Sequence, residues 1–230
     1  MPVTAGLVPF TTIDFPGHLA AAIFFKGCPL RCPFCHNPDL QNFSEINCIS
    51  WDEVISFLKQ RTRQLDGVAL SGGEPLAQPD IIPVVQSIKA MGYKVGIHTA
   101  GVYPDILKKL IPLIDWVGLD IKAPWQKYDV LAGRKNTVPL VQKSLRDLSD
   151  SGRAFEVRTT CDPRYLTVDD IYAIAAEIKS CGVTTYALQK YRTFPGDQNP
   201  PEDSAINIFF ENEPLIQKLK SDFPTLILRD

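Results

Sequence analysis

The stretch LAAAIFFKGCPLRCPFCHNPD, residues 19–39, joins a short apolar run to a loop with three cysteines and a histidine. The run at 19–25 has the length and composition of a buried β-strand. Directly after it, Cys28, Cys32 and Cys35 follow one another at C-x3-C-x2-C spacing, with prolines stiffening the path between them. A strand that ends in such a loop predicts a ligand site at the C-terminal edge of a sheet.

Further strand candidates follow at regular intervals, and amphipathic segments separate them. These candidates are GVALS (67–71), YKVGIHT (93–99), DWVGLDIK (115–122), AFEVRTT (154–160) and TTYALQK (184–190). Helix start signals are Ser50 with Glu53, Thr167 with Asp170, and Thr137 before residues 138–148. Three helix patterns end at a glycine just before a strand, in GYKV, SGRA and CGVT. Repeated βα order of this kind predicts a parallel sheet with right-handed crossovers.

The number of βα units decides between barrel and flat sheet. Six units are fewer than the eight of a closed barrel, so the expected fold is an incomplete (β/α)6 barrel, open at the side. A flat, doubly wound sheet is the alternative. Residues 1–194 are expected to form the partial barrel. Residues 195–230, with a helix pattern near 213–223 and a short TLILR strand, are expected to pack on it as a tail and not as a domain.

Composition excludes some classes of protein. The chain has 230 residues and a net charge of −2, which argues against a nucleic-acid-binding surface. No apolar run reaches the ~18 residues that span a membrane. The N-terminus carries no Lys or Arg before its short apolar run and meets Asp14 early, so a targeting peptide is not expected. We therefore expect the protein to reside in a reducing cytoplasm. There, six cysteines are more often metal ligands or core residues than members of disulfides.

Polar or small residues follow nearly every predicted strand. They are the cysteine loop, Ser71 to Glu74, His98 and Thr99, Asp120 and Lys122, Arg158 to Thr160, and Gln189 to Arg192. In parallel α/β folds the carboxyl ends of the strands meet at one edge, where sites assemble. We expect all of these ends to converge on one mouth.

Three thiolates in one loop are compatible with several metal groups. Such soft ligands select zinc, copper or iron–sulfur. Zinc would need a distant fourth ligand such as Cys48, because the adjacent Cys35 and His36 could hardly fill two vertices of one tetrahedron. The C-x-x-C-H pattern also matches covalent haem attachment, but that leaves Cys28 unexplained and requires export. An iron–sulfur cluster held by three thiolates differs, since one iron lacks a protein ligand.

Further short motifs extend the cysteine pattern. Phe34 completes C-x3-C-x-aromatic-C, and SGGEP follows the second strand at 71–75. Together these two motifs resemble the signature of the radical S-adenosylmethionine superfamily. DFPG (14–17), CHNP (35–38) and DIK (120–122) are more narrowly similar to the glycyl-radical-enzyme activases, above all to the anaerobic ribonucleoside-triphosphate reductase activating proteins. The resemblance runs from about residue 11 to residue 192.

This resemblance implies a cofactor pair and a reaction. Cys28, Cys32 and Cys35 would hold a [4Fe-4S] cluster whose open iron chelates S-adenosylmethionine. Reductive cleavage would give methionine and a 5′-deoxyadenosyl radical, the cofactor carrying the hard chemistry. The radical would take a hydrogen atom from a glycine of a glycyl radical enzyme, first of all anaerobic ribonucleotide reductase, with a flavodoxin- or ferredoxin-type reductant. A pyruvate formate-lyase type partner or a small-molecule substrate is the alternative.

The resemblance also assigns cofactor contacts near the cluster. Phe34 would lie against the adenine, although a loop aromatic can also simply pack on the barrel rim. His36 belongs to the CHNP run and would brace the cluster loop beside the cofactor. Gly72 and Gly73 would let the backbone approach the methionyl group, which a Cβ would obstruct. Glu74 would accept a hydrogen bond from the ammonium or order its own loop.

The remaining contacts come from later strands. Asp120 and Lys122 share a strand face and by resemblance meet the ribose or carboxylate, although such a pair is often a plain surface ion pair. Arg158 is placed like the family's carboxylate-binding arginine. Arg192 stands where activases often carry a histidine. HTAG at 98–101 replaces the family's T-N-G run, with alanine for asparagine and histidine where an acid is frequent. The other cysteines are interpreted as structural: Cys48, Cys161 and Cys181.

Overall fold

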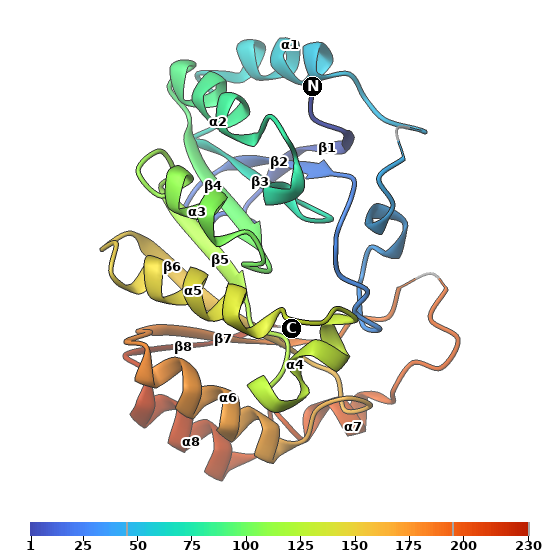
Figure 1. The fold of residues 1–230 in the computed structure, drawn as a ribbon, viewed down its shortest axis with the longest axis vertical. Helices are drawn as coiled ribbons and strands as arrows, with labels where there is room; N and C mark the ends of the chain where they lie inside the picture. The colour runs from blue at the N-terminus through green and yellow to red at the C-terminus, as the bar shows by residue number, and fades with distance from the viewer. Residues whose placement is uncertain (45, 195, 230) are drawn as a thin grey trace.

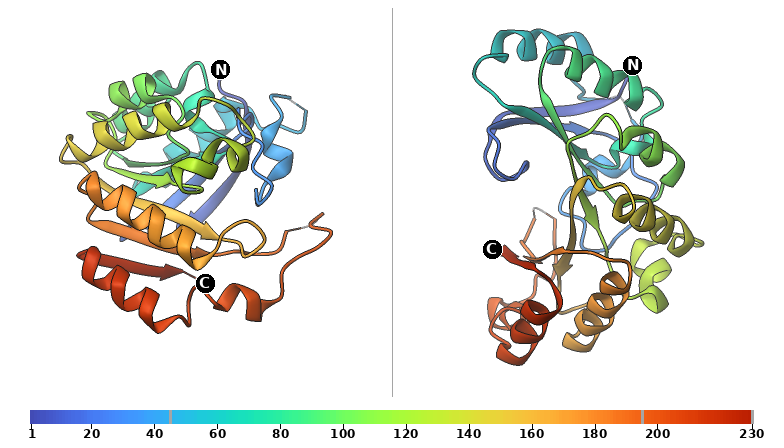
Figure 2. Two further views of the ribbon diagram at one scale, coloured as in Figure 1. Left: turned by 60° about the horizontal axis from the view of Figure 1, so that its bottom comes forward. Right: turned by 90° about the vertical axis from the view of Figure 1, so that its left-hand side faces the viewer.

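The computed structural model describes residues 1–44, 46–194 and 196–229. Its centre is one curved eight-stranded sheet, with helices along the outer face (Figure 1, Figure 2). The strands are β1 (Thr4–Thr11), β2 (Ala20–Phe25), β3 (Gly67–Gly72), β4 (Lys94–Thr99), β5 (Trp116–Asp120), β6 (Ala154–Cys161), β7 (Thr185–Lys190) and β8 (Thr225–Arg229).

Helices connect the strands. They are α1 (Trp51–Arg61), α2 (Ile81–Ala90), α3 (Pro104–Leu110), α4 (Trp125–Ala132), α5 (Val138–Ser149), α6 (Val168–Ser180), α7 (Asp203–Asn207) and α8 (Glu213–Asp222), with short 3-10 turns η1 (Pro38–Gln41) and η2 (Pro75–Ala77). Among the described residues, no helix combines the length and the apolar character needed to cross a membrane.

The strands lie in the sheet in the order of the chain. From β2 to β8 all neighbours are parallel, whereas β1 pairs antiparallel with β2. β1 and β8 are the two rims of the curve (Figure 2). The expected open α/β barrel is confirmed. Two details were not part of the six-unit prediction: the antiparallel strand β1, and the TLILR strand as a further parallel neighbour of β7.

Most local predictions also hold. Both capping boxes form, at Ser50 before α1 and at Thr167 before α6. The predicted cap at Thr137 is wrong in its mechanism. α5 begins after that residue, but the Thr137 hydroxyl donates to the carbonyl of Arg134 (2.8 Å) and makes no cap. Thr137 has helical dihedral angles (φ −83°, ψ −38°) and not the extended backbone of an N-cap, so its oxygen does not accept from the amide groups of the first turn.

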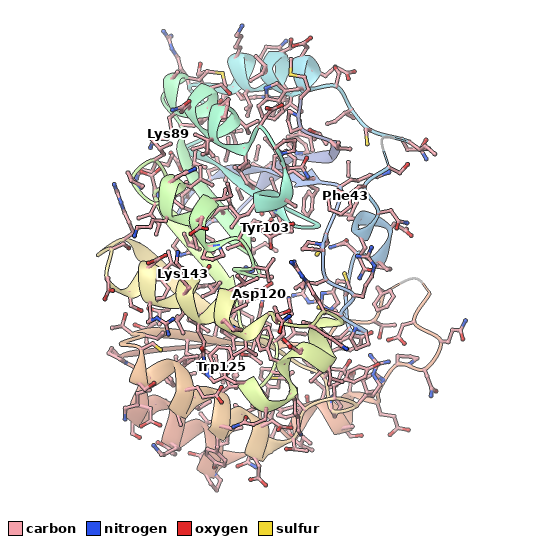
Figure 3. All side chains as sticks on the ribbon, in the orientation of Figure 1. Phe43, Lys89, Tyr103, Asp120, Trp125 and Lys143 are labelled. Atoms are coloured by element: carbon pink, nitrogen blue, oxygen red, sulfur yellow. The ribbon has the colours of Figure 1, made fainter. Side chains whose placement is uncertain are left out.

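The outer face of the sheet is a continuous apolar layer. Its side chains are fully buried under the helices and include Ile23, Leu70, Ile97, Leu119 and Val157. Polar side chains of the same helices lie on the far side, as Figure 3 shows for Lys89 on α2 and Lys143 on α5. Burial of these aliphatic residues, at ~1.5–3 kcal/mol each, holds the helices on the strands.

The half of the inner face near the N-terminal ends of the strands is built from small residues. Ala20, Ala22, Gly67, Ala69 and Gly96 occupy the inward positions of β2, β3 and β4. The space that they leave is filled by two aromatic rings, Phe15 and Trp116, whose centroids are 6.0 Å apart. A methyl group on Gly67 would lie 2.8 Å from the Phe15 ring, so glycine is required there by packing. The DFPG segment thus plugs the base of the half-barrel.

The half of the inner face near the C-terminal ends of the strands is polar. Because strand side chains alternate with period two, the next inward positions above the plug are Ser71 on β3, His98 on β4, Asp120 on β5 and Arg158 on β6. These side chains form the floor of the cavity described below.

The tail adds a further βα layer at the β7 rim. β8 pairs with β7, α8 contacts α6, and Lys179 pairs with Asp222 at 2.6 Å across these helices. That residues 1–194 form the barrel domain and 195–230 a dependent tail stays a prediction. Residue 195, at its boundary, lies outside the described residues.

Candidate active site

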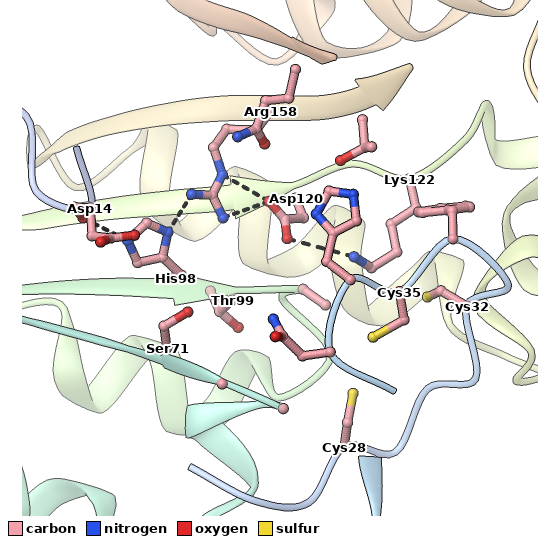
Figure 4. Close-up of a pocket in the computed structure, with 18 of the residues that line it drawn as sticks. Asp14, Cys28, Cys32, Cys35, Ser71, His98, Thr99, Asp120, Lys122 and Arg158 are labelled. Atoms are coloured by element: carbon pink, nitrogen blue, oxygen red, sulfur yellow. Dashed lines mark hydrogen bonds and ion pairs between the residues drawn. The ribbon is translucent and has the colours of Figure 1, made fainter. Parts of the chain in front are cut away.

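A cavity of about 650 Å³ lies at the C-terminal ends of the strands, above the aromatic plug (Figure 4). It brings together the predicted site residues Cys28, Cys32, Phe34, Cys35, His36, Gly72, Gly73, Asp120, Lys122, Arg158 and Arg192. Glu74 is the one predicted residue outside its lining. The convergence that the sequence predicts for the strand ends is therefore found.

The cysteine loop is fixed by backbone contacts on both sides. The amide of Cys28 donates to the carbonyl of Gln41 (3.1 Å), and the amide of Arg31 donates to the carbonyl of Ala132 at the end of α4 (2.9 Å). The Arg31 guanidinium returns to the carbonyl of Cys28 (2.6 Å). Leu30 is buried between the cysteines as an anchor. The three thiols are thereby held toward one cavity and are free of disulfides.

The thiols lie in a weakly solvated environment. Burial, reinforced by the Glu74 carboxylate, raises the pKa of the Cys28 thiol to about 12. Burial also raises the pKa of Cys32, against the opposing effect of the Lys122 ammonium. Thiols with raised pKa values keep their protons at neutral pH until a cation compensates the thiolate charge. Cys28 and Cys32 are therefore weak nucleophiles on their own at neutral pH.

The glycine pair at the end of β3 packs closely against β2 and the start of the cysteine loop. Gly72 has φ +115°, and a Cβ there would lie 2.3 Å from the backbone of Phe25. A Cβ on Gly73 would lie 2.5 Å from the carbonyl oxygen of Gly27. Gly72 is therefore required by its contact with β2, and Gly73 by its contact with the cysteine loop, whatever ligand the cavity holds.

The Glu74 side chain contacts the HTAG segment (98–101) at the end of β4. Its carboxylate accepts hydrogen bonds from the Thr99 hydroxyl (2.7 Å), the Ala100 amide (2.8 Å) and the Leu76 amide (3.1 Å). The residue is 1% exposed, and burial raises its pKa against these stabilising bonds. Its oxygens thus hold the HTAG loop in place. The amide of Ala100, where the family's asparagine would stand, is engaged in the same way.

A chain of charged and polar groups crosses the floor of the cavity (Figure 4). Arg158 donates to Asp120 through Nε (2.8 Å) and pairs with it through Nη2 (2.6 Å), and Lys122 lies 3.6 Å from the same carboxylate. Burial opposes ionisation of Asp120, but the two cations outweigh it and lower the pKa of this carboxyl. At the other end Nη1 of Arg158 contacts Nδ1 of His98, whose Nε2 contacts the Asp14 carbonyl (2.6 Å).

The wall beside the cluster loop is aromatic. Phe34 is buried, and its ring centroid lies 5.9 Å from that of Tyr165. The His36 ring lies 5.5 Å from the Tyr191 ring, and its Nε2 accepts from the Arg192 amide (3.3 Å). Burial and the Arg192 guanidinium lower the pKa of His36, in keeping with this acceptor role. His36 therefore ties the cysteine loop to the segment after β7.

Several lining residues were not predicted as site residues. Thr12, Ile13 and Asp14 come from the connection before β2, and Lys190 and Arg229 come from β7 and β8. Arg229 makes a bidentate pair with Glu156, a buried residue of β6. The DFPG motif was a signal for the first group. For Arg229 the only signal was a polar residue at the end of the TLILR run.

The remaining cysteines are not part of the cavity lining. Cys161 occupies an outward position of β6 and is fully buried in the core under the helices. Cys48 bonds weakly to the carbonyl of Ser44 (3.8 Å), and Cys181 is the C-cap of α6. None of them lines the pocket, so the described structure offers the cavity three thiols.

Comparison with known proteins identifies the family. A profile of the Radical SAM superfamily matches residues 22–175. A candidate glycyl-radical enzyme activating enzyme of Methanocaldococcus jannaschii is 33% identical over 221 residues, covering 92% of this chain and 88% of that protein. A pyruvate formate-lyase-activating enzyme of Staphylococcus aureus is 33% identical over 187 residues, covering 74% and 72%.

Solved structures show the same fold. SuiB of Streptococcus suis bound to S-adenosylmethionine superposes with a TM-score of 0.68 at 17% identity over 87% of this chain, which spans about half of SuiB (47%). SuiB bound to its precursor peptide SuiA gives a TM-score of 0.70 over 88% and 46%.

The donor set agrees with the family's cofactors, a [4Fe-4S] cluster and S-adenosylmethionine. Three single thiol donors face one cavity, which suits a cluster whose irons take separate thiolates and leave one iron for a ligand. This chain belongs to the Radical SAM superfamily and, within it, to the glycyl-radical enzyme activating enzymes.

Proposed function

We propose that this enzyme generates the glycyl radical of an anaerobic ribonucleoside-triphosphate reductase. One observation carries the proposal: the same cavity is lined by the three cysteines and by the DFPG segment, beside the open side of the sheet. A cofactor at the cysteines and a peptide at the DFPG segment would thus share one space. The reaction would run in the cytoplasm with electrons from a flavodoxin- or ferredoxin-type protein.

The three thiols would hold the cluster. When bound, the [4Fe-4S] cluster supplies one electron for homolytic cleavage of the carbon–sulfur bond of S-adenosylmethionine. The protein places the groups around it. Lys122, whose pKa is raised because Cys32 and Asp120 outweigh the opposing effect of burial, adds a fixed positive charge next to the thiolates. This charge stabilises the anionic cluster site.

Arg158 is the best candidate to hold the cofactor's carboxylate. A guanidinium has five N–H donors. In the described structure one Nε and one Nη2 hydrogen serve Asp120, and one Nη1 hydrogen serves His98. Each terminal nitrogen therefore keeps one hydrogen, the set that a bidentate carboxylate needs. Asp120 and Lys122 would meet the ribose or the carboxylate, and Phe34 would cover the adenine, as the resemblance implies.

The partner side is marked by apolar residues that face solvent. Val8 and Phe10 on β1 are 41% and 58% exposed, and Ile13, a lining residue of the cavity, is 74% exposed. Val8 and Phe10 precede Ile13 along the chain, and exposed apolar side chains of this kind are typical of protein contact sites. Together with a compact barrel, they favour a loop of a large protein over a small molecule as substrate.

The test is transfer of hydrogen from a defined glycine. Reduced enzyme, S-adenosylmethionine and an anaerobic ribonucleotide reductase carrying deuterated glycine are mixed without oxygen. We expect a glycyl radical signal in electron paramagnetic resonance and deuterium in 5′-deoxyadenosine. The matched control is a reductase with Ala in place of its radical glycine, which should give neither signal.

The relatives favour a second candidate within the same class. Because pyruvate formate-lyase-activating enzymes are 33% identical to this chain, a pyruvate formate-lyase is tested in parallel. A radical on that enzyme and none on the reductase would replace the proposed partner. Cleavage of the cofactor without a radical on either protein would contradict both and favour a small-molecule substrate.

A further inference from the structure

His98 joins two parts of the cavity that are far apart in the chain. It lies on the inner face of β4, with its ring edge-on to Trp116 at 5.2 Å between centroids. On one side Nδ1 meets Nη1 of Arg158, and on the other Nε2 lies 2.6 Å from the carbonyl oxygen of Asp14 (Figure 4). The ring is thus the bridge between the DFPG segment and the cation that faces the cofactor site.

The two partners fix the protonation of the ring. A guanidinium can only donate, so Nδ1 must accept, and a carbonyl can only accept, so Nε2 must carry the hydrogen. The neutral Nε2–H tautomer satisfies both contacts, whereas a protonated ring would place an N–H against the N–H of Arg158. Residues with this dual bonding orient their neighbours on both sides.

The charged groups around His98 and its burial also favour the neutral ring. Arg158 on β6 and Arg229 on β8 act on the ring as cations, while Asp120 on β5 and the Asp14 carbonyl act in the opposite direction. Burial and Arg158 prevail, and they lower the pKa of His98 to about 3. The bridge therefore stays intact across the working pH range of an enzyme.

We propose that His98 is a positioning residue that couples the peptide-binding segment to Arg158, an inference that rests on the proposed function. The contacts that hold the DFPG segment include the packing of the Phe15 ring in the plug, the hydrogen bond from the Thr11 hydroxyl to the Asp14 carboxylate (2.6 Å), and the contact of His98 with the Asp14 carbonyl. A partner loop that presses on this segment shifts Asp14, and His98 transmits the shift to the guanidinium. Substrate docking and cofactor orientation are then linked through one ring.

Two substitutions separate the two halves of the bridge. In His98→Asn the amide oxygen can replace Nδ1 as acceptor for Arg158, but no group reaches the Asp14 carbonyl. In His98→Gln the amide can replace Nε2 as donor to Asp14, and the acceptor for Arg158 is lost. His18→Asn is the matched control, because His18 contacts the Pro16 carbonyl (2.9 Å) at the exposed edge of the same segment and contacts no cavity cation.

The variants should fail in opposite ways. We expect His98→Gln to weaken S-adenosylmethionine binding by ~10-fold, the scale of one lost hydrogen bond to a charged group, and to keep the glycyl radical yield per cofactor cleaved. His98→Asn should bind the cofactor within ~3-fold of the wild type, and its radical yield per cofactor cleaved should fall by ~10-fold. His18→Asn should leave cofactor affinity unchanged. Equal losses of both quantities in the two His98 variants would overturn the proposal.

A second measurement is independent of activity and of the partner. Nitrogen-15 NMR of the cluster-free protein, with His98 assigned by its absence in the variants, should show a protonated Nε2 and an unprotonated Nδ1 from pH 5 to 8. A protonated Nδ1 would contradict the bridge. If no reductase or lyase acquires a radical with the wild-type enzyme, the proposed function fails. The NMR and affinity results still decide whether His98 positions Arg158.

Discussion

The outer and inner faces of the same strands differ sharply in their side chains. Outward positions carry large aliphatic residues that are fully buried under helices, as Leu70, Leu119 and Val157 show. Inward positions carry glycine and alanine at the base, and histidine, aspartate and arginine at the top. Alternate residues of one strand therefore serve stability and chemistry separately. Substitutions on the two faces can therefore test stability and chemistry separately.

The largest expected effect divides the cysteines. Cys32→Ala removes one of the three thiols that line the cavity and should abolish bound iron, because two thiolates would not complete the proposed cluster site. Cys161→Ala, a change on the outer side of β6, should retain iron despite its buried position. Iron and sulfide content after anaerobic reconstitution measure both. Full iron in the Cys32 variant would remove the cysteine loop from the site.

The second effect concerns an outward residue next to the site. Leu119→Ala leaves a cavity in the apolar layer and should lower the free energy of unfolding by ~2–5 kcal/mol. Denaturant titration measures this loss, and equilibrium dialysis of the folded variant should show an unchanged affinity for S-adenosylmethionine. A tenfold weaker affinity would show that the two faces are not independent.

The third effect concerns the neighbouring inward residue. A Cβ on Gly118 would lie 2.8 Å from the Trp116 ring and 2.9 Å from Nη1 of Arg158. Gly118→Ala should cost ~1–3 kcal/mol in unfolding free energy through overpacking, and it should weaken cofactor binding because Arg158 must move. Gly6→Ala on β1, where a Cβ meets nothing within 4 Å, is the control. A Gly118 variant that binds the cofactor normally would separate Arg158 from the cofactor's carboxylate.

The smallest effect is a pH dependence of stability. His98 has a folded-state pKa lowered to about 3 by burial and Arg158, below the unfolded value near ~6.5. Between these two pH values His98 binds a proton in the unfolded chain but not in the folded chain. The contribution of the neutral ring to the free energy of unfolding is therefore complete above pH ~6.5 and is lost as the pH falls toward 3. Urea unfolding of the cluster-free protein should show up to ~1.4 kcal/mol lost per pH unit between 6 and 5. His98→Asn should have a shallower slope.

Local patterns were enough to predict most of the sheet. The strand candidates, both capping boxes and the glycines after the helices depend on neighbouring residues alone, and all agree with the structure. β1 was missed because its sequence, TAGLVPFT, contains Gly and Pro and lacks a clear alternation. Its strand character comes from the pairing with β2, which a local pattern does not contain.

The contacts at the floor of the cavity likewise include partners that a local sequence pattern does not contain. Asp120, Lys122 and Arg158 were placed by the rule that strand ends converge, and they do meet. The bond between His98 and Asp14 joins residues 84 positions apart, and the role of Glu74 under the HTAG loop joins residues 25 and 26 apart. Such contacts depend on the curvature of the sheet. The motifs marked these residues, and only the fold supplies their partners.

The aromatic plug also sets an order of events during synthesis. Phe15 leaves the ribosome early, but Gly67 and Gly96, against which its ring packs, and its neighbour Trp116 emerge later. At ~5–20 residues per second, the interval before Trp116 is made is on the order of 5–20 s. Throughout that interval the native surroundings of the ring are incomplete, because Trp116 is missing from the cluster that also contains the alanines of β2. The Phe15 ring can therefore reach its final packing only after residue 116 has been made, long after its own synthesis and that of the neighbouring β1–β2 pair.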